Sequence, residues 1–302
     1  MDYTDLLNPQ IPKLPVYQPG RPIELVAREF GLSPDKIIKL ASNENPLGIC
    51  PTGREAAEKA LKDGWMYPDN AGYFLVNRLA KRHGVNFEQI ALGAGSNEIF
   101  YMLCALFVRP GVEVVMGEYA FISYKIGTVL SGGTPVLVEM PNYGHDLKAM
   151  REAITDKTRL VFLPNPNDPT GSLVEEAELL AFARSLPDHV VFCYDEAYAE
   201  YQECPADISS LIAEGRKVIG TRTFSKIFGL AGLRIGYGYG EIELMKLLNS
   251  VRAPFNTSSI AQVAALAALE DTDWVSRSRA VNAVGLKQLE AGFTELGLEW
   301  VP

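Results

Sequence analysis

Lys226 stands among side chains that could hold a phosphate group beside a reactive amine. Thr223 and Ser225 precede it, and Arg234 follows it eight positions later (234 − 226). Hydroxyls and a guanidinium bind phosphate oxygens, and an amine whose pKa is lowered by apolar neighbours such as Phe224 can form an imine with an aldehyde. Most lysines are only solvated surface charges, but this pattern predicts one that binds a phosphorylated aldehyde.

A carboxylate lies where a buried strand is expected to end. The apolar run 190–194 leads directly into Asp195, and Glu196 and Tyr198 follow it. Pyridoxal phosphate (PLP) requires a Schiff-base lysine, a carboxylate against its pyridinium nitrogen and a cup for its phosphate. The sequence offers a candidate for each: Lys226 for the imine, Asp195 for the ring nitrogen, and the hydroxyls near Lys226 for the phosphate. An Asp-Glu pair after a strand also fits the charged first turn of a helix, and Glu196 can have that role while Asp195 faces the ring.

Buried strands must bring these two segments together. Short apolar runs alternate with helical patterns, which predicts a mostly parallel, doubly wound α/β sheet. We expect strands at 112–116, 135–139, 159–163, 190–194, 217–221 and 234–239, and helices at 98–108, 121–131, 147–153, 175–186 and 208–214. Because ligands bind at the carboxyl ends of strands in such sheets, Asp195 and the loop carrying Lys226 are expected to meet there.

These motifs, in this order, resemble those of the class I/II aminotransferases, which are PLP-dependent enzymes of fold type I. Within that group the chain is most similar to the histidinol-phosphate aminotransferases. The resemblance extends from the segment 42–48 to the segment 252–256. It implies an N-terminal arm and small-domain segment at 1–40, a large PLP-binding domain at 41–254, and the start of a smaller, C-terminal α+β domain at 255–302. Further helices are expected at 23–30, 260–270 and 273–296.

The resemblance also implies roles around the cofactor. A glycine-rich turn before a helix can bind an anion, and the family match assigns Ser96 and Asn97, which follow such a turn at 93–95, to the cofactor phosphate. Tyr119 matches the aromatic residue that stacks on the pyridine ring. Tyr198, three residues after Asp195, can hydrogen-bond the phenolic oxygen and help to lower the pKa of the imine. Lys226 would also move a proton as general base and acid.

Three further residues take their expected roles from the resemblance alone. Tyr67 matches a tyrosine that reaches the cofactor phosphate of a neighbouring subunit, which implies a homodimer. Tyr17 and Asn45 fall in segments that line the substrate pocket of the family.

The turn 165–171 departs from the family pattern. The residue before its Pro-Thr-Gly is commonly an asparagine that donates to the phenolic oxygen, and here it is Asp168. An ionised carboxylate cannot donate a hydrogen bond. Either Asn167 takes over that role or Asp168 changes the surroundings of the oxygen, so both residues are candidates.

Charge and hydropathy exclude other classes. The net charge is −9 and no basic cluster stands out, which disfavours nucleic acid as a partner. Acidic residues occupy the N-terminus where a signal peptide would be basic, and no apolar run approaches the roughly 18 residues of a membrane span. We expect a cytoplasmic protein.

Cysteines and histidines give no sign of a disulfide framework or a metal site. The cysteines are Cys50, Cys104, Cys193 and Cys204, and the histidines are His83, His145 and His189. Since no CxxC pair or ligand spacing occurs, we expect reduced cysteines, surface or turn histidines and no bound metal.

The resemblance implies transfer of an amino group from L-histidinol phosphate to 2-oxoglutarate, a step of histidine biosynthesis, in a ping-pong reaction. Two alternatives share the fold: an aromatic amino acid aminotransferase and a phosphothreonine-type decarboxylase. Only the decarboxylase would release carbon dioxide without consuming 2-oxoglutarate.

Family members continue for several dozen residues past the position of Pro302, so the C-terminal domain is expected to be only partly contained in this sequence. The remainder normally carries an arginine that binds the substrate's carboxylate or phosphate. A non-catalytic chain that binds PLP or a partner is therefore a hypothesis from another class. The length of the reading frame would distinguish the two.

Overall fold

A single sheet organises the chain, whose computed structural model describes residues 6–7, 9–14, 17 and 19–301. In this described part the sheet has seven strands in the order β1-β7-β6-β5-β4-β2-β3. The strands are β1 (Ile90–Gly93), β2 (Glu113–Gly117), β3 (Thr134–Val138), β4 (Thr158–Pro164), β5 (Val191–Asp195), β6 (Val218–Thr223) and β7 (Gly236–Gly240). Every residue of β5 and β6 is buried, as expected for strands covered on both faces.

The predicted mostly parallel sheet is confirmed, with one strand reversed. β7 runs antiparallel to both its neighbours, β1 and β6, and the pairs from β6 through β5 and β4 to β2 and β3 are parallel. β1, which has only four residues, was not among the expected strands. His83 is half-buried and directly precedes the left-handed turn at Gly84, and its ring stacks on Tyr239 of β7 with the centroids 3.8 Å apart.

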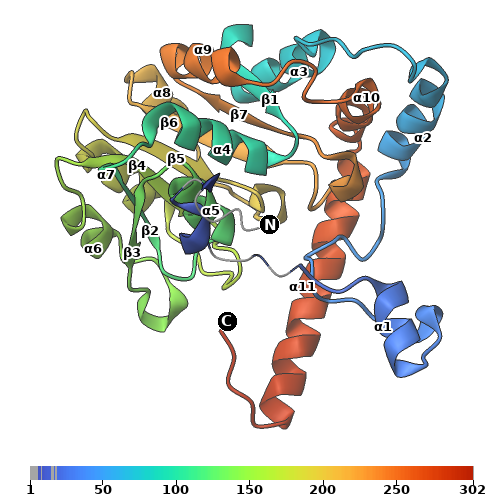
Figure 1. Ribbon diagram of the computed structural model, residues 1–302. Helices are drawn as coiled ribbons and strands as arrows, with labels where there is room; N and C mark the ends of the chain where they lie inside the picture. Colours follow the sequence, from blue (N-terminus) through green and yellow to red (C-terminus); the bar gives the residue numbers. More distant parts are fainter. Residues whose placement is uncertain (1–5, 8, 15–16, 18, 302) are drawn as a thin grey trace.

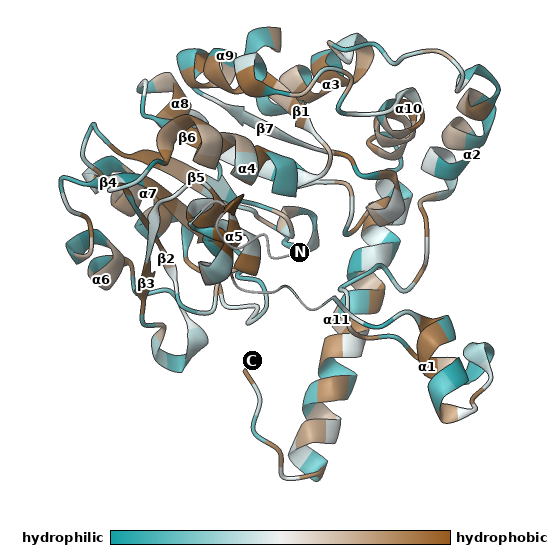
Figure 2. Ribbon diagram, in the orientation of Figure 1, coloured by the Kyte–Doolittle hydropathy of each residue, from teal (hydrophilic) through white to brown (hydrophobic). Residues whose placement is uncertain are grey.

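Helices cover both faces of the sheet and enclose two apolar cores (Figures 1 and 2). One face packs against α4 (Ser96–Phe107), α5 (Ile122–Leu130) and α9 (Ile242–Val251). The other packs against α3 (Tyr73–His83), α6 (Leu147–Glu152), α7 (Glu176–Ser185), α8 (Ser209–Ala213) and α10 (Ser259–Ala268). This two-sided cover is the doubly wound arrangement that the sequence predicts.

The remaining helices lie toward the ends of the chain. They are α1 (Ile23–Phe30), α2 (Pro51–Ala60) and α11 (Thr272–Glu295). Short 3-10 turns occur at Ile11–Lys13, Pro34–Lys36, Leu61–Asp63, Phe87–Gln89, Pro141–Tyr143, Ala199–Tyr201 and Ala231–Leu233. The domain boundaries at 40 and 254 stay a prediction. None of the described helices is long and apolar enough to cross a membrane.

The long helix α11 begins at the sheet and then projects from it (Figure 1). At its buried start, Trp274 Nε1 donates to the carbonyl oxygen of Ile227 at 2.8 Å. Asn45 Nδ2 donates to the same oxygen at 2.7 Å and to Ser278 Oγ at 3.0 Å. These contacts anchor the residue that follows Lys226, so α11 helps to fix the loop on which the amine stands.

Gly229 gives this loop its tight turn. Its φ is +66°, and an added Cβ would overlap the carbonyl oxygen of Gly48. Only glycine adopts such a conformation at low cost.

We predict that Gly229→Ala lowers the free energy of unfolding by more than about 1 kcal/mol, because the new methyl group meets backbone in a strained conformation. Gly232→Ala is the matched control, since a Cβ there has open space around it. Thermal unfolding of both variants measures the difference. Equal losses of Tm would contradict the account.

Candidate active site

Three neighbouring parallel strands place the predicted residues at one edge of the sheet. Pro164 at the end of β4 pairs with Asp195 at the end of β5, which in turn pairs with Thr221 of β6. The segments that leave these strands therefore emerge side by side, as they do at ligand sites of parallel sheets.

A cavity of about 250 Å³ lies at this edge. Its lining contains most of the predicted site residues, namely Ser96, Asn97, Asp168, Asp195, Tyr198, Thr223, Ser225, Lys226 and Arg234. Residues from parts of the sequence more than a hundred positions apart thus share one chamber, as the motif order predicts.

Asp195 lies at the buried end of the cavity, 4% exposed. Tyr124 Oη donates to its Oδ2 at 2.6 Å, and Thr221 Oγ1 and the Ala197 amide donate to its Oδ1 at 3.1 and 3.2 Å. Burial raises the pKa of this carboxyl to about 6, although the hydrogen bonds from Tyr124 and Thr221 lower it. Among the described residues no cation forms an ion pair with it, so a protonated ring nitrogen would supply the missing charge.

The Lys226 amine lies in the same chamber, with Nζ 5.1 Å from the centroid of the Tyr198 ring. Burial lowers the pKa of this amine, while the charges of Asp168 and Asp195 raise it. Tyr198 Oη donates to Asp168 Oδ2 at 2.8 Å and accepts from Asn43 Nδ2 at 2.9 Å. Burial and the Asp168 charge raise the pKa of Tyr198, which keeps its hydroxyl protonated.

Hydroxyls, a guanidinium and a helix N-terminus meet in the same cavity. Thr223 Oγ1 donates to Ser225 Oγ at 2.9 Å, and Arg234 Nη1 lies 3.3 Å from the same oxygen. Arg234 Nη2 donates to the Ala94 carbonyl at 3.0 Å, directly before α4, which begins at Ser96. Free backbone N–H groups at a helix start attract phosphate.

The residues present fit pyridoxal phosphate. Ser96 and Asn97, the first two residues of α4, line the cavity beside the Arg234 guanidinium. Gly95 has a φ of +80°, and a Cβ there would overlap the Arg234 guanidinium, so the turn before α4 leaves backbone open to an anion. Donors for a phosphate, a carboxylate for a ring nitrogen and a free amine occur in one chamber.

An aromatic residue that the sequence analysis did not name lines the cavity. Phe121 contributes to this chamber and to a second one of about 370 Å³ that adjoins it. Tyr119 lines only the second, together with Tyr17 and Asn43. Stacking of Tyr119 on the cofactor stays a prediction, and Phe121 is better placed for that contact.

Tyr124 was also missed, although the sequence contains a signal for it. It is a fully buried hydroxyl-bearing residue in α5, three positions after Phe121. A tyrosine in an apolar helix needs a hydrogen-bond partner if its side chain is buried. That partner is Asp195.

Three predicted residues line neither of these cavities. Asn167 Nδ2 donates to the Tyr119 carbonyl at 3.2 Å and to Thr170 Oγ1 at 2.8 Å, so it shapes the wall of the second chamber. Asn45 is buried, and its amide is occupied by the backbone and α11 contacts described above. Tyr67 is 83% exposed and stacks on Phe255 at 4.8 Å. The roles predicted for all three stay predictions.

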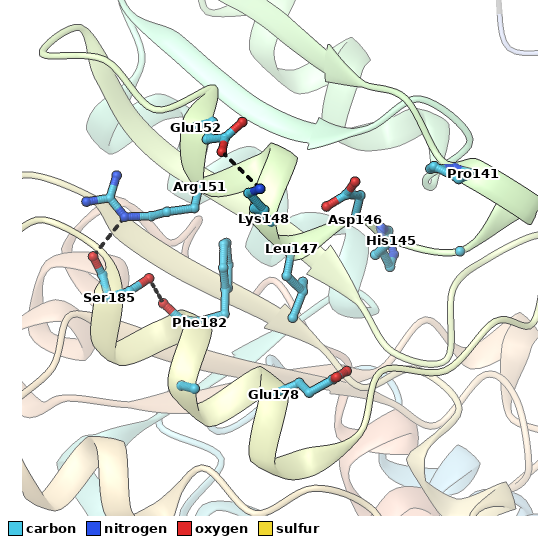
Figure 3. Close-up of a pocket in the computed structure, with 12 residues that line it drawn as sticks. Pro141, His145, Asp146, Leu147, Lys148, Arg151, Glu152, Glu178, Phe182 and Ser185 are labelled. Atoms are coloured by element: carbon cyan, nitrogen blue, oxygen red, sulfur yellow. Dashed lines mark hydrogen bonds and ion pairs between the residues drawn. The ribbon is translucent and has the colours of Figure 1, made fainter.

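A wider hollow of about 710 Å³ between α6 and α7 contains none of these residues (Figure 3). Its cations already have partners: Arg151 Nε donates to the Ser185 carbonyl at 3.0 Å, and Lys148 lies 3.9 Å from Glu152. The chemistry of the chain is therefore concentrated at the edge of the sheet.

Comparison with known proteins agrees with this geometry. The family model of class I and II aminotransferases matches residues 35–302. The chain belongs to this family. Histidinol-phosphate aminotransferase 2 of Pseudomonas fluorescens is 44% identical, and the match covers 100% of this chain and 82% of that protein. Histidinol-phosphate aminotransferase of Akkermansia muciniphila is also 44% identical, over 100% of this chain and 84% of that protein.

Solved structures show the same fold. Histidinol-phosphate aminotransferase of Sinorhizobium meliloti in complex with pyridoxal-5'-phosphate is 30% identical, with a TM-score of 0.89 over 98% of this chain and 80% of that one. Aspartate aminotransferase of Thermus thermophilus with maleate is 25% identical, with a TM-score of 0.82 over 98% of this chain and 82% of that one. The predicted fold type I is confirmed. The chain is a PLP-dependent aminotransferase, which requires an amino donor and a 2-oxo acid acceptor.

The pKa of Asp195 predicts a pH dependence of stability in the cofactor-free protein. The folded-state pKa of about 6 exceeds the ordinary value of 3.8, so the folded chain holds this proton more tightly than the unfolded chain. Asp195 therefore destabilises the fold increasingly as pH rises from about 4 to 6. Relative to wild type, Asp195→Asn should gain on the order of 3 kcal/mol in unfolding free energy between pH 4 and 7.

Urea unfolding at both pH values measures this gain. Asp156→Asn, at an exposed aspartate, controls for the general loss of a carboxylate. A stability difference between Asp195→Asn and wild type that stays the same at both pH values would contradict the burial argument.

Proposed function

We propose that this protein transfers the amino group of L-histidinol phosphate to 2-oxoglutarate in histidine biosynthesis. The observation that carries the proposal is the single chamber in which Lys226, Asp195 and the phosphate-binding side chains meet. Relatives named as histidinol-phosphate aminotransferases, 44% identical over the whole chain, support the choice of donor.

Pyridoxal phosphate supplies an aldehyde that bonds to amines and a ring that withdraws electrons from the substrate's α-carbon. Thr223, Ser225, Arg234 and the start of α4 would hold its phosphate. Asp195 would accept the hydrogen bond of the ring nitrogen and keep that proton in place. Phe121 would lie against the ring.

Lys226 carries the proton transfer. Burial lowers the pKa of its amine and so favours the neutral form, which can take the proton from the substrate's α-carbon and return one in the second half-reaction. The Tyr198 ring centroid lies 5.1 Å from that nitrogen, and Asn43 and Asp168 hold the Tyr198 hydroxyl by hydrogen bonds. The adjoining chamber with Tyr17 and Tyr119 would receive the rest of the substrate.

A homodimer and a cytoplasmic location form part of the proposal. Trp65, Tyr67 and Phe74 are 82%, 83% and 74% exposed, and large exposed aromatic side chains within ten residues of one another favour an interface with a second copy. The cysteines of the described chain are unpaired, and Cys50, Cys104 and Cys193 are buried, which suits a reducing compartment.

Lys226→Ala tests the assigned amine. We expect the purified wild-type protein with added PLP to show a visible absorbance band, and L-histidinol phosphate to bleach it. The variant should fold with an unchanged Tm, lack the band and lose transamination. Turnover retained in Lys226→Ala would falsify the mechanism.

The same spectra, together with assays of carbon dioxide and 2-oxoglutarate, separate the alternative functions. A band that is unchanged by L-histidinol phosphate but is bleached by phenylalanine or tyrosine indicates an aromatic aminotransferase. Release of carbon dioxide without consumption of 2-oxoglutarate indicates a decarboxylase. A protein that binds PLP but turns over none of these donors indicates a non-catalytic chain.

Mixed dimers test the proposed role of Tyr67. Lys226→Ala and Tyr67→Ala homodimers should both be impaired, the first through its amine and the second through weaker cofactor binding. A hybrid of the two contains one site with both native residues, so the isolated hybrid should have roughly half the activity of wild type, and an equilibrated equimolar mixture about a quarter. No recovery in hybrids verified by sedimentation and mass spectrometry would show that Tyr67 does not serve the partner's site.

A further inference from the structure

A buried ion network lies on the face of the sheet opposite the cavity. Successive strand residues point to opposite faces, so Arg222 points away from Thr221 and Thr223, whose hydroxyls serve the cavity. Its guanidinium lies between Glu196 and Glu200. Nε and Nη2 donate to Glu196 Oε2 at 3.2 and 2.7 Å, and Nη1 donates to Glu200 Oε1 at 3.1 Å.

All three charges are removed from water. Arg222 is 8% exposed, Glu196 is fully buried and Glu200 is 5% exposed. Tyr239 Oη also donates to Glu196, and Arg82 Nη2 lies 3.4 Å from Glu200 Oε1. Desolvation of such groups offsets much of their attraction, and apolar replacements in other proteins are often as stable. Stability alone is thus a weak reason for this network.

The positions of the two glutamates point to a different purpose. They lie two residues before and two residues after Tyr198 (196 and 200), and Arg222 lies four residues before Lys226. One guanidinium therefore connects the segment that carries Tyr198 to the strand that leads into Lys226. On the cavity side, the Tyr198 ring lies 5.1 Å from Lys226 Nζ.

We propose that Arg222 is a positioning residue that, through Glu196 and Glu200, fixes the Tyr198 side chain relative to the Lys226 amine. The planar guanidinium donates in fixed directions, which sets the separation of the two carboxylates, whereas a lysine ammonium would keep the charge without that geometry. The inference rests on the proposed function in that Tyr198 and Lys226 act at the cofactor.

A double-mutant cycle of Arg222→Lys and Tyr198→Phe tests this. Arg222→Lys should bind PLP and lower kcat by about 100-fold, as small displacements in active sites do, with KM for the donor changed less than about threefold. The pKa at which its visible band titrates should move toward that of Tyr198→Phe. In the Tyr198→Phe background, Arg222→Lys should change kcat by less than about threefold, because its target is already absent.

Controls separate positioning from general damage. Arg184, which forms a bidentate pair with Glu214 at the surface, offers the matched Arg184→Lys variant, and it should change neither kcat nor the titration. If Arg222→Lys fails to fold, Glu200→Gln replaces it in the cycle, since Glu196 still neutralises Arg222. Additive effects in whichever cycle is run would overturn the proposal.

The titration of the band requires no substrate. Wild-type protein that shows the band but does not turn over L-histidinol phosphate would contradict the proposed donor alone. The cycle would then be scored on the band pKa, where non-additivity supports the positioning role and additivity refutes it.

Discussion

The parallel pairing of β4, β5 and β6 is the constraint on which the site depends. It aligns Pro164, Asp195 and Thr221 across three strands, so the segments that follow leave the sheet at one edge. A shift of register by one residue would turn every side chain to the opposite face. Glu196 would then occupy the cavity and Asp195 would face Arg222. The apolar cores on both faces oppose such a slip.

The buried carboxylates on the two faces of these strands differ in whether a cation neutralises them. Glu196, on the supporting face, is neutralised by Arg222. Asp195, its neighbour in sequence, has hydrogen-bond donors but no ion pair among the described residues, and burial raises its pKa to about 6. Uncompensated charge beside an amine with a lowered pKa is typical of a site that a charged ligand completes. The neighbouring residues Asp195 and Glu196 thus have different roles: Asp195 faces the cofactor site, and Glu196 belongs to the ion network that supports that site.

Much of this arrangement could be predicted from the sequence, because Asp195 and Lys226 each follow an apolar run that only a buried strand explains. Other features depend on contacts between distant residues. Local patterns do not show which aromatic residue before α5 faces the cavity, and Phe121 rather than Tyr119 lines it. Asn45 was expected at the substrate, yet its amide bonds to Ser278, 233 positions away. From the sequence alone Arg222 is an ordinary polar residue near a strand end. Only the structure shows that it binds two glutamates, one on either side of Tyr198 in the sequence.

The most direct test of the central claim is to reduce the PLP-loaded protein with borohydride and map the labelled peptide by mass spectrometry. The account predicts a pyridoxyl group on Lys226 and on no other lysine at stoichiometric loading. A label on a different lysine, or none on the folded and PLP-saturated protein, would contradict the claim that the edge formed by β4, β5 and β6 is the cofactor site.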